Sequence, residues 1–124
     1  MCCIDILLAL VNIAERLDDR HYQPEKRYVH EVLVVENTEL ARCLGKRKLF
    51  VNSIHHDYID FSFKELIVSA YSDDGIIEAV EVPGVKFAMG LQWHPEYLMD
   101  DVSRKIFDRF VGSLDECVSG DSLN

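Results

Sequence analysis

The chain has few basic residues: 13 lysines and arginines stand against 22 aspartates and glutamates, so the formal net charge is −9. Because neutralising phosphate groups requires clustered lysine and arginine, this balance argues against nucleic acid or an anionic membrane as a partner. The only basic cluster, Lys46-Arg47-Lys48, is short enough to be a solvated turn.

Cysteine motifs and long apolar runs are also lacking. Cys2, Cys3, Cys43 and Cys117 show no C-x-x-C spacing, which excludes a disulfide scaffold and favours reduced thiols. The apolar N-terminal run is interrupted and too short to span a bilayer, and no basic segment or small-residue cleavage site indicates a signal peptide. We therefore predict a cytoplasmic protein that does not contact membranes.

The residues that are present suffice for one globular domain. A chain of 124 residues with 48% hydrophobic content can bury about two thirds of its unfolded surface. We expect this domain to cover residues 1–114 and a polar tail to cover residues 115–124.

Periodicity and turn residues predict a helix, several strands and a final helix, an order typical of an α/β protein. The expected helices are Ile4–Leu17, Glu39–Leu44 and Val102–Leu114. Thr38 would cap the short helix and Gly45 would end it, while Asp100 or Asp101 would cap the last one. The expected strands are Val29–Val35, Leu49–Ile54, Leu66–Ser72, Ile76–Val82 and Val85–Trp93, with a hairpin turn at Asp73-Asp74-Gly75. Two acidic residues inside the fourth strand, Glu78 and Glu81, are expected to be solvated and are assigned no role.

The most informative segment is Gln92-Trp93-His94-Pro95-Glu96. Alternate residues of an extended segment point to the same side, so His94 and Glu96 are expected to lie next to each other. The carboxylate would fix the imidazole tautomer through one ring nitrogen and leave the other nitrogen free as a base. Pro95 restricts its own φ and the conformation of His94, which partly orders the pair in advance.

Three blocks, in this order and spacing, resemble class I glutamine amidotransferase domains, in particular the γ-glutamyl-γ-aminobutyrate hydrolase or peptidase C26 branch. The blocks are Val51–Asp57, which reads V-N-S-I-H-H-D, Asp73–Glu81, which reads D-D-G-I-I-E-A-V-E, and Met89–Glu96, which reads M-G-L-Q-W-H-P-E. The resemblance implies part of a flavodoxin-like α/β sheet with flanking helices. It also implies that roughly the N-terminal half of the family domain is missing.

The chemistry implied by the resemblance is hydrolysis of γ-glutamyl amides by a cysteine nucleophile. His94 matches the general base and Glu96 the carboxylate that orients it. His55 and His56 match residues near the substrate pocket, whereas Asp57 replaces the usual glutamine. The family nucleophile lies in a G-x-C-x-G elbow, which this sequence does not contain.

Cys2 and Cys3 lie near the position in the sequence where the nucleophile is expected. An elbow, however, needs a preceding strand and flanking glycines, and neither cysteine has them. We therefore expect no family-level turnover from this chain alone.

Several alternatives follow for the partner and the activity. A second chain carrying the nucleophile would make a split enzyme, whereas a non-catalytic homodimer would bury Ile4–Leu17 and an edge strand. A free-standing hydrolase would use Cys2 or Cys3.

A metal site is a further alternative, but its candidate ligands match no known zinc spacing. The prediction is therefore that the protein has no metal or other cofactor. The candidate ligands are His55, His56, Asp57, His94 and Glu96.

Overall fold

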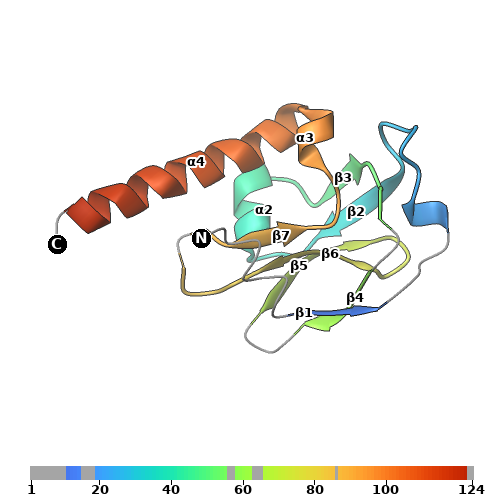
Figure 1. The fold of residues 1–124 in the computed structure, drawn as a ribbon, viewed down its shortest axis with the longest axis horizontal. Helices are drawn as coiled ribbons and strands as arrows, with labels where there is room; N and C mark the ends of the chain where they lie inside the picture. The colour runs from blue at the N-terminus through green and yellow to red at the C-terminus, as the bar shows by residue number, and fades with distance from the viewer. Residues whose placement is uncertain (1–10, 15–18, 56–57, 63–65, 86, 123–124) are drawn as a thin grey trace.

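The computed structural model describes residues 11–14, 19–55, 58–62, 66–85 and 87–122 (Figure 1). The strands are β1 (Val11–Ala14), β2 (His30–Val34), β3 (Lys48–Val51), β4 (Tyr58–Ser62), β5 (Ile67–Ser72), β6 (Ile77–Glu81) and β7 (Met89–Leu91). The helices are the 3-10 turn η1 (Asp19–His21), α2 (Glu39–Leu44), α3 (Pro95–Leu98) and α4 (Asp101–Ser122).

The strands in the described ranges form one sheet in the order β1-β4-β6-β5-β2-β3, and β7 also pairs with β6. All of these pairings are antiparallel. Helices α2 and α4 lie together on one side of the sheet (Figure 1). The predicted α/β class is confirmed. The described strands contain no parallel pair, so a parallel, flavodoxin-like portion of the sheet is not among them.

Helix α2 forms where the sequence predicts it. The hydroxyl of Thr38 accepts a hydrogen bond from the Ala41 N–H at 3.1 Å, which satisfies one of the free donors of the first turn. At the other end Gly45 adopts a left-handed conformation with φ of 66° and donates its N–H to the Ala41 carbonyl.

Glu81 also holds the first turn of α2, so the prediction that this residue is solvated is wrong. Its side chain is buried, and its carboxylate accepts hydrogen bonds from the backbone N–H groups of Glu39 at 2.7 Å and Leu40 at 3.3 Å. A negative charge at this end complements the helix dipole. Strand β6 is buried along its whole length, and an acidic residue there needs such partners.

The structure corrects two other predicted elements. Residues 11–14 form strand β1 rather than part of a helix, and the rest of the predicted helix over residues 4–17 lies outside the described residues. An apolar run suits a buried strand as well as a buried helix, and pairing with β4 decides between them.

Strand β4 is an element that the sequence did not predict. The long strand expected over residues 85–93 is only the three residues of β7, because a turn occupies residues 83–85 and the chain bends after Leu91.

The main hydrophobic core lies between the sheet and the helices. It contains residues from β2, α2, β3, β5, β6, β7, α3 and α4 together with Trp93, which is 3% exposed. A second, smaller cluster is formed by Leu66, Ile77 and Val80. Strand β6 contributes to both clusters, which explains its complete burial.

Helix α4 is confirmed, and Asp100 is its cap: Oδ1 accepts the Ser103 N–H at 2.9 Å and the Ser103 hydroxyl at 2.6 Å. The helix continues to Ser122, through most of the segment predicted as a polar tail. Ile106 is buried in the core, whereas Val111 and Leu114 near the far end of the described side chains are about half exposed.

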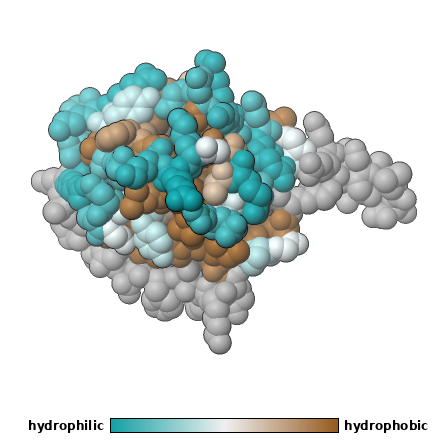
Figure 2. Space-filling model, turned by 180° about the vertical axis from the view of Figure 1, so that it is seen from behind, coloured by the Kyte–Doolittle hydropathy of each residue, from teal (hydrophilic) through white to brown (hydrophobic). Residues whose placement is uncertain are grey.

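No helix within the described ranges is both long enough and apolar enough to cross a bilayer. On the reverse side of the molecule, hydrophilic residues cover the upper part of the described surface, above an apolar area (Figure 2).

We predict that Asp100→Ala lowers the free energy of unfolding by about 1–2 kcal/mol at pH 7, because the cap of α4 is lost. Burial alone would raise the pKa of Asp100, but hydrogen bonds from Ser103 and Tyr28 outweigh it and lower the pKa below the ordinary value of 3.8. A lowered folded-state pKa means that the contribution is present above about pH 4 and is lost as the pH falls further.

Urea denaturation at pH 7 and pH 3 measures this difference, with Asp101→Ala as the neighbouring acidic control. The expected result is a loss that is specific to Asp100 and shrinks at pH 3. Equal losses for the two variants, or a loss independent of pH, would contradict the capping role.

Candidate active site

His94 and Glu96 pair as predicted, at the corner between β7 and α3. The Nδ1 atom of His94 lies 2.6 Å from Oε1 of Glu96. The sequence predicted an extended segment for this pair, and that prediction is wrong, because Pro95 begins helix α3 directly after His94. Proline is favoured at this first helical position, and the turn brings Glu96 back toward the imidazole.

The hydrogen bond assigns different roles to the two ring nitrogens of His94. A carboxylate accepts, so in the neutral imidazole Nδ1 carries the proton and Nε2 keeps its lone pair. The imidazole is 38% exposed and the Glu96 side chain 49% exposed. Tyr97 stacks on the ring, with the centroids 5.3 Å apart. The arrangement can therefore accept a proton at Nε2 from a group that approaches from solvent.

Asn52 holds the backbone of His94 with two hydrogen bonds. The Asn52 carbonyl oxygen accepts the His94 N–H at 2.8 Å, and the Asn52 amide donates to the His94 carbonyl at 2.9 Å. The Asn52 side chain is buried. An amide group matches both partners because it carries a donor and an acceptor, so Asn52 fixes the position of the segment that presents the imidazole.

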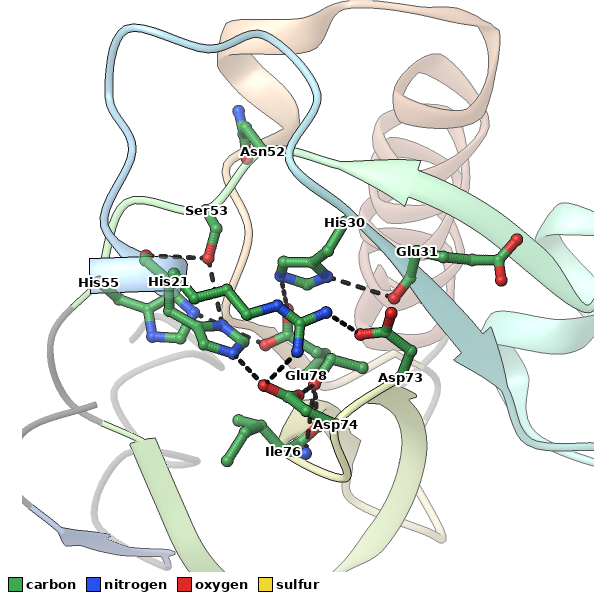
Figure 3. Close-up of polar contacts among 12 residues, drawn as sticks. His21, His30, Glu31, Asn52, Ser53, His55, Asp73, Asp74, Ile76 and Glu78 are labelled. Carbon is green, nitrogen blue, oxygen red and sulfur yellow. Dashed lines mark hydrogen bonds and ion pairs between the residues drawn. The ribbon is translucent and has the colours of Figure 1, made fainter. Parts of the chain in front are cut away.

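A second group of titratable residues lies inside the fold (Figure 3). His21 from η1, His30 from β2 and Glu78 from β6 are all buried. The Nε2 atom of His30 lies 3.3 Å from Oε1 of Glu78, and the Nε2 atom of His55 lies 3.6 Å from Oε2. The ring of His21 is 4.9 Å from that of His30 and 5.1 Å from that of His55. Three imidazoles thus surround one carboxylate.

Glu78 contradicts the prediction of a solvated strand position, since it is 0% exposed. Neither of its carboxylate oxygens accepts a hydrogen bond from a described residue. Burying an isolated carboxylate costs several kcal/mol even after relaxation, so a compensating positive charge is required close by. The hairpin turn that precedes β6 is present as predicted, at residues 73–75.

This turn also supplies a carboxylate to the histidine group. Oδ2 of Asp74 lies 2.7 Å from Nε2 of His21 and 2.9 Å from Nη1 of Arg20. Burial alone would raise the pKa of Asp74, but hydrogen bonds from His21 and Ser72 and the charges of His21 and Arg20 lower it to about 2. Asp74 is therefore ionised and orients the ring of His21.

The predicted substrate contacts are only partly covered by the structure. His56, together with Asp57, lies outside the described residues. The His55 side chain is 10% exposed and faces Glu78, and its backbone N–H donates to the His21 carbonyl at 2.9 Å. A substrate role for His55 and His56 stays a prediction.

The loop after β3 connects the two groups. Asn52 holds His94, whereas the next residue, Ser53, donates its hydroxyl to the His21 carbonyl at 2.9 Å. The Glu78 carbonyl accepts the N–H of Gln92, two residues before His94, at 2.8 Å. The buried histidine group therefore supports the backbone that presents the His94–Glu96 pair.

Cys43 is the only cysteine whose side chain is described, and it does not have the properties of a nucleophile. Its thiol lies 3.2 Å from the Lys105 carbonyl, to which it donates. Burial raises the pKa of the Cys43 thiol, and the charge of Glu39 raises it further, so little thiolate is present at neutral pH. Cys2 and Cys3 lie outside the described residues.

The fold resembles solved glutaminase-type structures. A candidate GMP synthase component from Thermoplasma acidophilum superimposes with a TM-score of 0.69 at 20% identity, over 95% of this chain and 54% of the other. The glutaminase domain of Trypanosoma brucei CTP synthase gives a TM-score of 0.58 at 19% identity, over 78% of this chain and 44% of the other. The fold is therefore that of about half of such a domain.

Sequence comparison identifies the family. Residues 7–96 match the Peptidase C26 family. A candidate glutamine amidotransferase-like protein of Rickettsia prowazekii is 39% identical over 95 residues, which cover 73% of this chain and 34% of the relative. The γ-glutamyl-γ-aminobutyrate hydrolase of Escherichia coli strain K12 is 36% identical over 104 residues, which cover 80% of this chain and 41% of the relative.

The chain belongs to the Peptidase C26 family of class I glutamine amidotransferase-like proteins. The predicted resemblance is confirmed. The chain spans less than half the length of these two relatives.

We predict that Asn52→Ala shifts the NMR signals of His94 and lowers the free energy of unfolding by about 1–3 kcal/mol, because two backbone groups lose their partner. A two-dimensional ¹H–¹⁵N spectrum and urea denaturation measure the two effects. Gln23→Ala is the matched control, since the Gln23 amide donates to the Arg20 carbonyl. Unchanged His94 signals in Asn52→Ala would show that the paired hydrogen bonds do not position this residue.

Proposed function

We propose that this chain supplies the proton-handling half of a γ-glutamyl amide hydrolase, with His94 as general base and Glu96 as the carboxylate that orients it. The observation that carries the proposal is the 2.6 Å contact between Nδ1 of His94 and Oε1 of Glu96. Membership of the Peptidase C26 family and the amide hydrolase relative from E. coli support the reaction class.

In this reaction Nε2 of His94 accepts the proton of a cysteine thiol, and the thiolate attacks the γ-carbonyl carbon of the amide. The protonated imidazole is stabilised by Glu96 and then donates the proton to the leaving amine as the C–N bond breaks. Water, deprotonated by the same nitrogen, attacks the resulting thioester. Hydrolysis releases the γ-carboxylate and restores the thiol.

The thiol must come from a G-x-C-x-G elbow, which the 124 residues do not contain. We propose that a second polypeptide segment supplies this elbow, together with the parallel part of the sheet. The unfavourable environment of Cys43 supports an external nucleophile, because burial and Glu39 both raise the pKa of its thiol.

The substrate class is part of the same proposal and is supported by the name of the E. coli relative. A γ-glutamyl amide presents a carbonyl carbon to the thiol and a free α-carboxylate to the pocket. We propose that His56 contacts this substrate and that His55 acts beside it, although its imidazole also faces Glu78.

The direct test mixes the chain with an elbow-bearing N-terminal half of a Peptidase C26 protein and measures hydrolysis of a chromogenic γ-glutamyl amide. We expect hydrolysis only in the mixture. Glu96→Gln should reduce the rate by about 10²–10⁴-fold, because the imidazole loses its tautomer control and the stabilisation of its charge, and His94→Ala should abolish it.

Glu36→Gln is the matched acidic control, since Glu36 is exposed and pairs only with Arg47 among the described ion pairs. It should leave the rate unchanged. Equal rates for the wild-type and His94→Ala mixtures would reject the split-enzyme proposal.

The second candidate is a non-catalytic module that forms a homodimer. Exposed apolar residues favour it: Phe50 on the edge strand β3 is 58% exposed, and Val111 on α4 is 55% exposed. Unpaired strand edges and apolar patches are typical association surfaces. Light scattering at micromolar concentration should then give the mass of two chains, and a clean monomer would reject this candidate.

A further inference from the structure

We propose that the buried group formed by His21, His30 and Glu78 binds one divalent transition-metal ion of the zinc type, with His55 as a fourth ligand. One ligand atom from each of the first three residues lies within 4.8 Å of the other two, and all three residues are buried. Imidazole nitrogens and a carboxylate oxygen are the donors that zinc commonly takes in proteins. The proposal is independent of catalysis by His94.

The spacing of the donor atoms fits a tetrahedral ion. Zinc bonds of about 2.0–2.1 Å place neighbouring ligand atoms about 3.3 Å apart. Nε2 of His30 lies 3.3 Å from Oε1 of Glu78, and Nε2 of His55 lies 3.6 Å from Oε2 (Figure 3). The ligand atoms of His21, His30 and Glu78 lie within 4.8 Å of one another, so the imidazoles would have to move closer together around a bound ion.

The hydrogen bond of His30 leaves one of its ring nitrogens without a partner among the described residues. Nδ1 of His30 lies 3.2 Å from the Glu31 carbonyl, which can only accept, so Nδ1 carries a proton and, in the neutral ring, the lone pair is on Nε2, which faces Glu78. Nε2 of His21 is held by the Asp74 carboxylate, and Nδ1 lies 3.3 Å from the Ser53 hydroxyl oxygen, a contact that a metal ion bound at Nδ1 would replace. A carboxylate or carbonyl that orients a histidine in this way is typical of metal ligands.

A metal ion explains the contacts better than a shared proton. A proton between imidazole and carboxylate would draw the heavy atoms to about 2.7–2.9 Å with a nearly straight hydrogen bond. The contacts of Glu78 are longer, and its two oxygens and Nε2 of His30 form no hydrogen bond with the described residues. The positive charge of Arg20 is already engaged by Asp73 and Asp74, so it does not oppose a cation strongly.

The bound ion would join four segments of the chain: η1, β2, the loop after β3, and β6. These segments include the loop that carries Asn52 and the strand whose Glu78 carbonyl holds Gln92. The metal would thus act as a structural tie beneath the backbone of His94, and its binding would stabilise the folded state by mass action.

The test uses the full chain after treatment with a chelator. Zinc is titrated in competition with a chromophoric chelator, and cobalt is used as a spectroscopic probe of the geometry. We expect one equivalent of zinc per chain, the intense visible bands of tetrahedral cobalt, and a melting temperature that rises with zinc and falls again with chelator. Binding below one equivalent, or the weak spectrum of octahedral cobalt, would overturn the proposal.

Variants locate the ion. Glu78→Gln and His30→Gln should each weaken zinc binding by more than about 100-fold. Asp74→Asn removes no proposed ligand but removes the charge that orients His21 and pairs with Arg20, and it should weaken binding by about 10–100-fold. His94→Ala and Glu96→Gln are the matched controls of the same residue types and should bind zinc as the wild type does.

Circular dichroism checks the fold of each variant. If one ligand variant does not fold, the other decides, and if neither folds, the cobalt spectrum of His94→Ala decides. Wild-type affinity in a folded ligand variant, or loss of the cobalt bands in folded His94→Ala, would place the ion elsewhere and overturn the proposal.

Discussion

The burial of the Glu78 carboxylate is the constraint on which the arrangement of this protein depends. Glu78 lies on β6, the strand that is paired with three others and buried along its length. A charge in that position must be compensated within the fold, because water does not reach it. Histidines from three separate segments converge on it, so the electrostatic requirement of one residue brings η1, β2 and the loop after β3 together.

The exposed pair of His94 and Glu96 benefits from this buried arrangement. The loop that delivers His55 to Glu78 also delivers Asn52 to the backbone of His94, and the backbone of Glu78 itself holds Gln92. The imidazole therefore projects from a segment that is fixed at both the strand and the loop. Catalytic groups need such support, since displacement by about an ångström can cost much of the rate.

Local features of the sequence predicted part of this structure. Thr38 and Gly45 bound α2 as expected, and His94 pairs with Glu96, because in both cases the interacting residues are close in sequence. The contact between Asn52 and His94 could not be predicted, because it joins residues 42 positions apart. The histidine group could not be predicted either, because its members come from four segments with no common spacing. Glu78 and Glu81 look solvated in the sequence only because the pattern does not reveal that β6 is covered on both sides. The apolar run that contains β1 was predicted as a helix, because a short apolar run fits a buried helix and a buried strand equally well.

We infer that the fold keeps His94 as a base whose proton lies on the nitrogen facing Glu96. Long-range ¹H–¹⁵N NMR of the histidine rings measures this directly at a pH where the imidazole is neutral. We expect the proton of His94 on Nδ1, and we expect this preference to disappear in Glu96→Gln. A proton on Nε2 of His94, or a tautomer ratio that Glu96→Gln does not change, would contradict it.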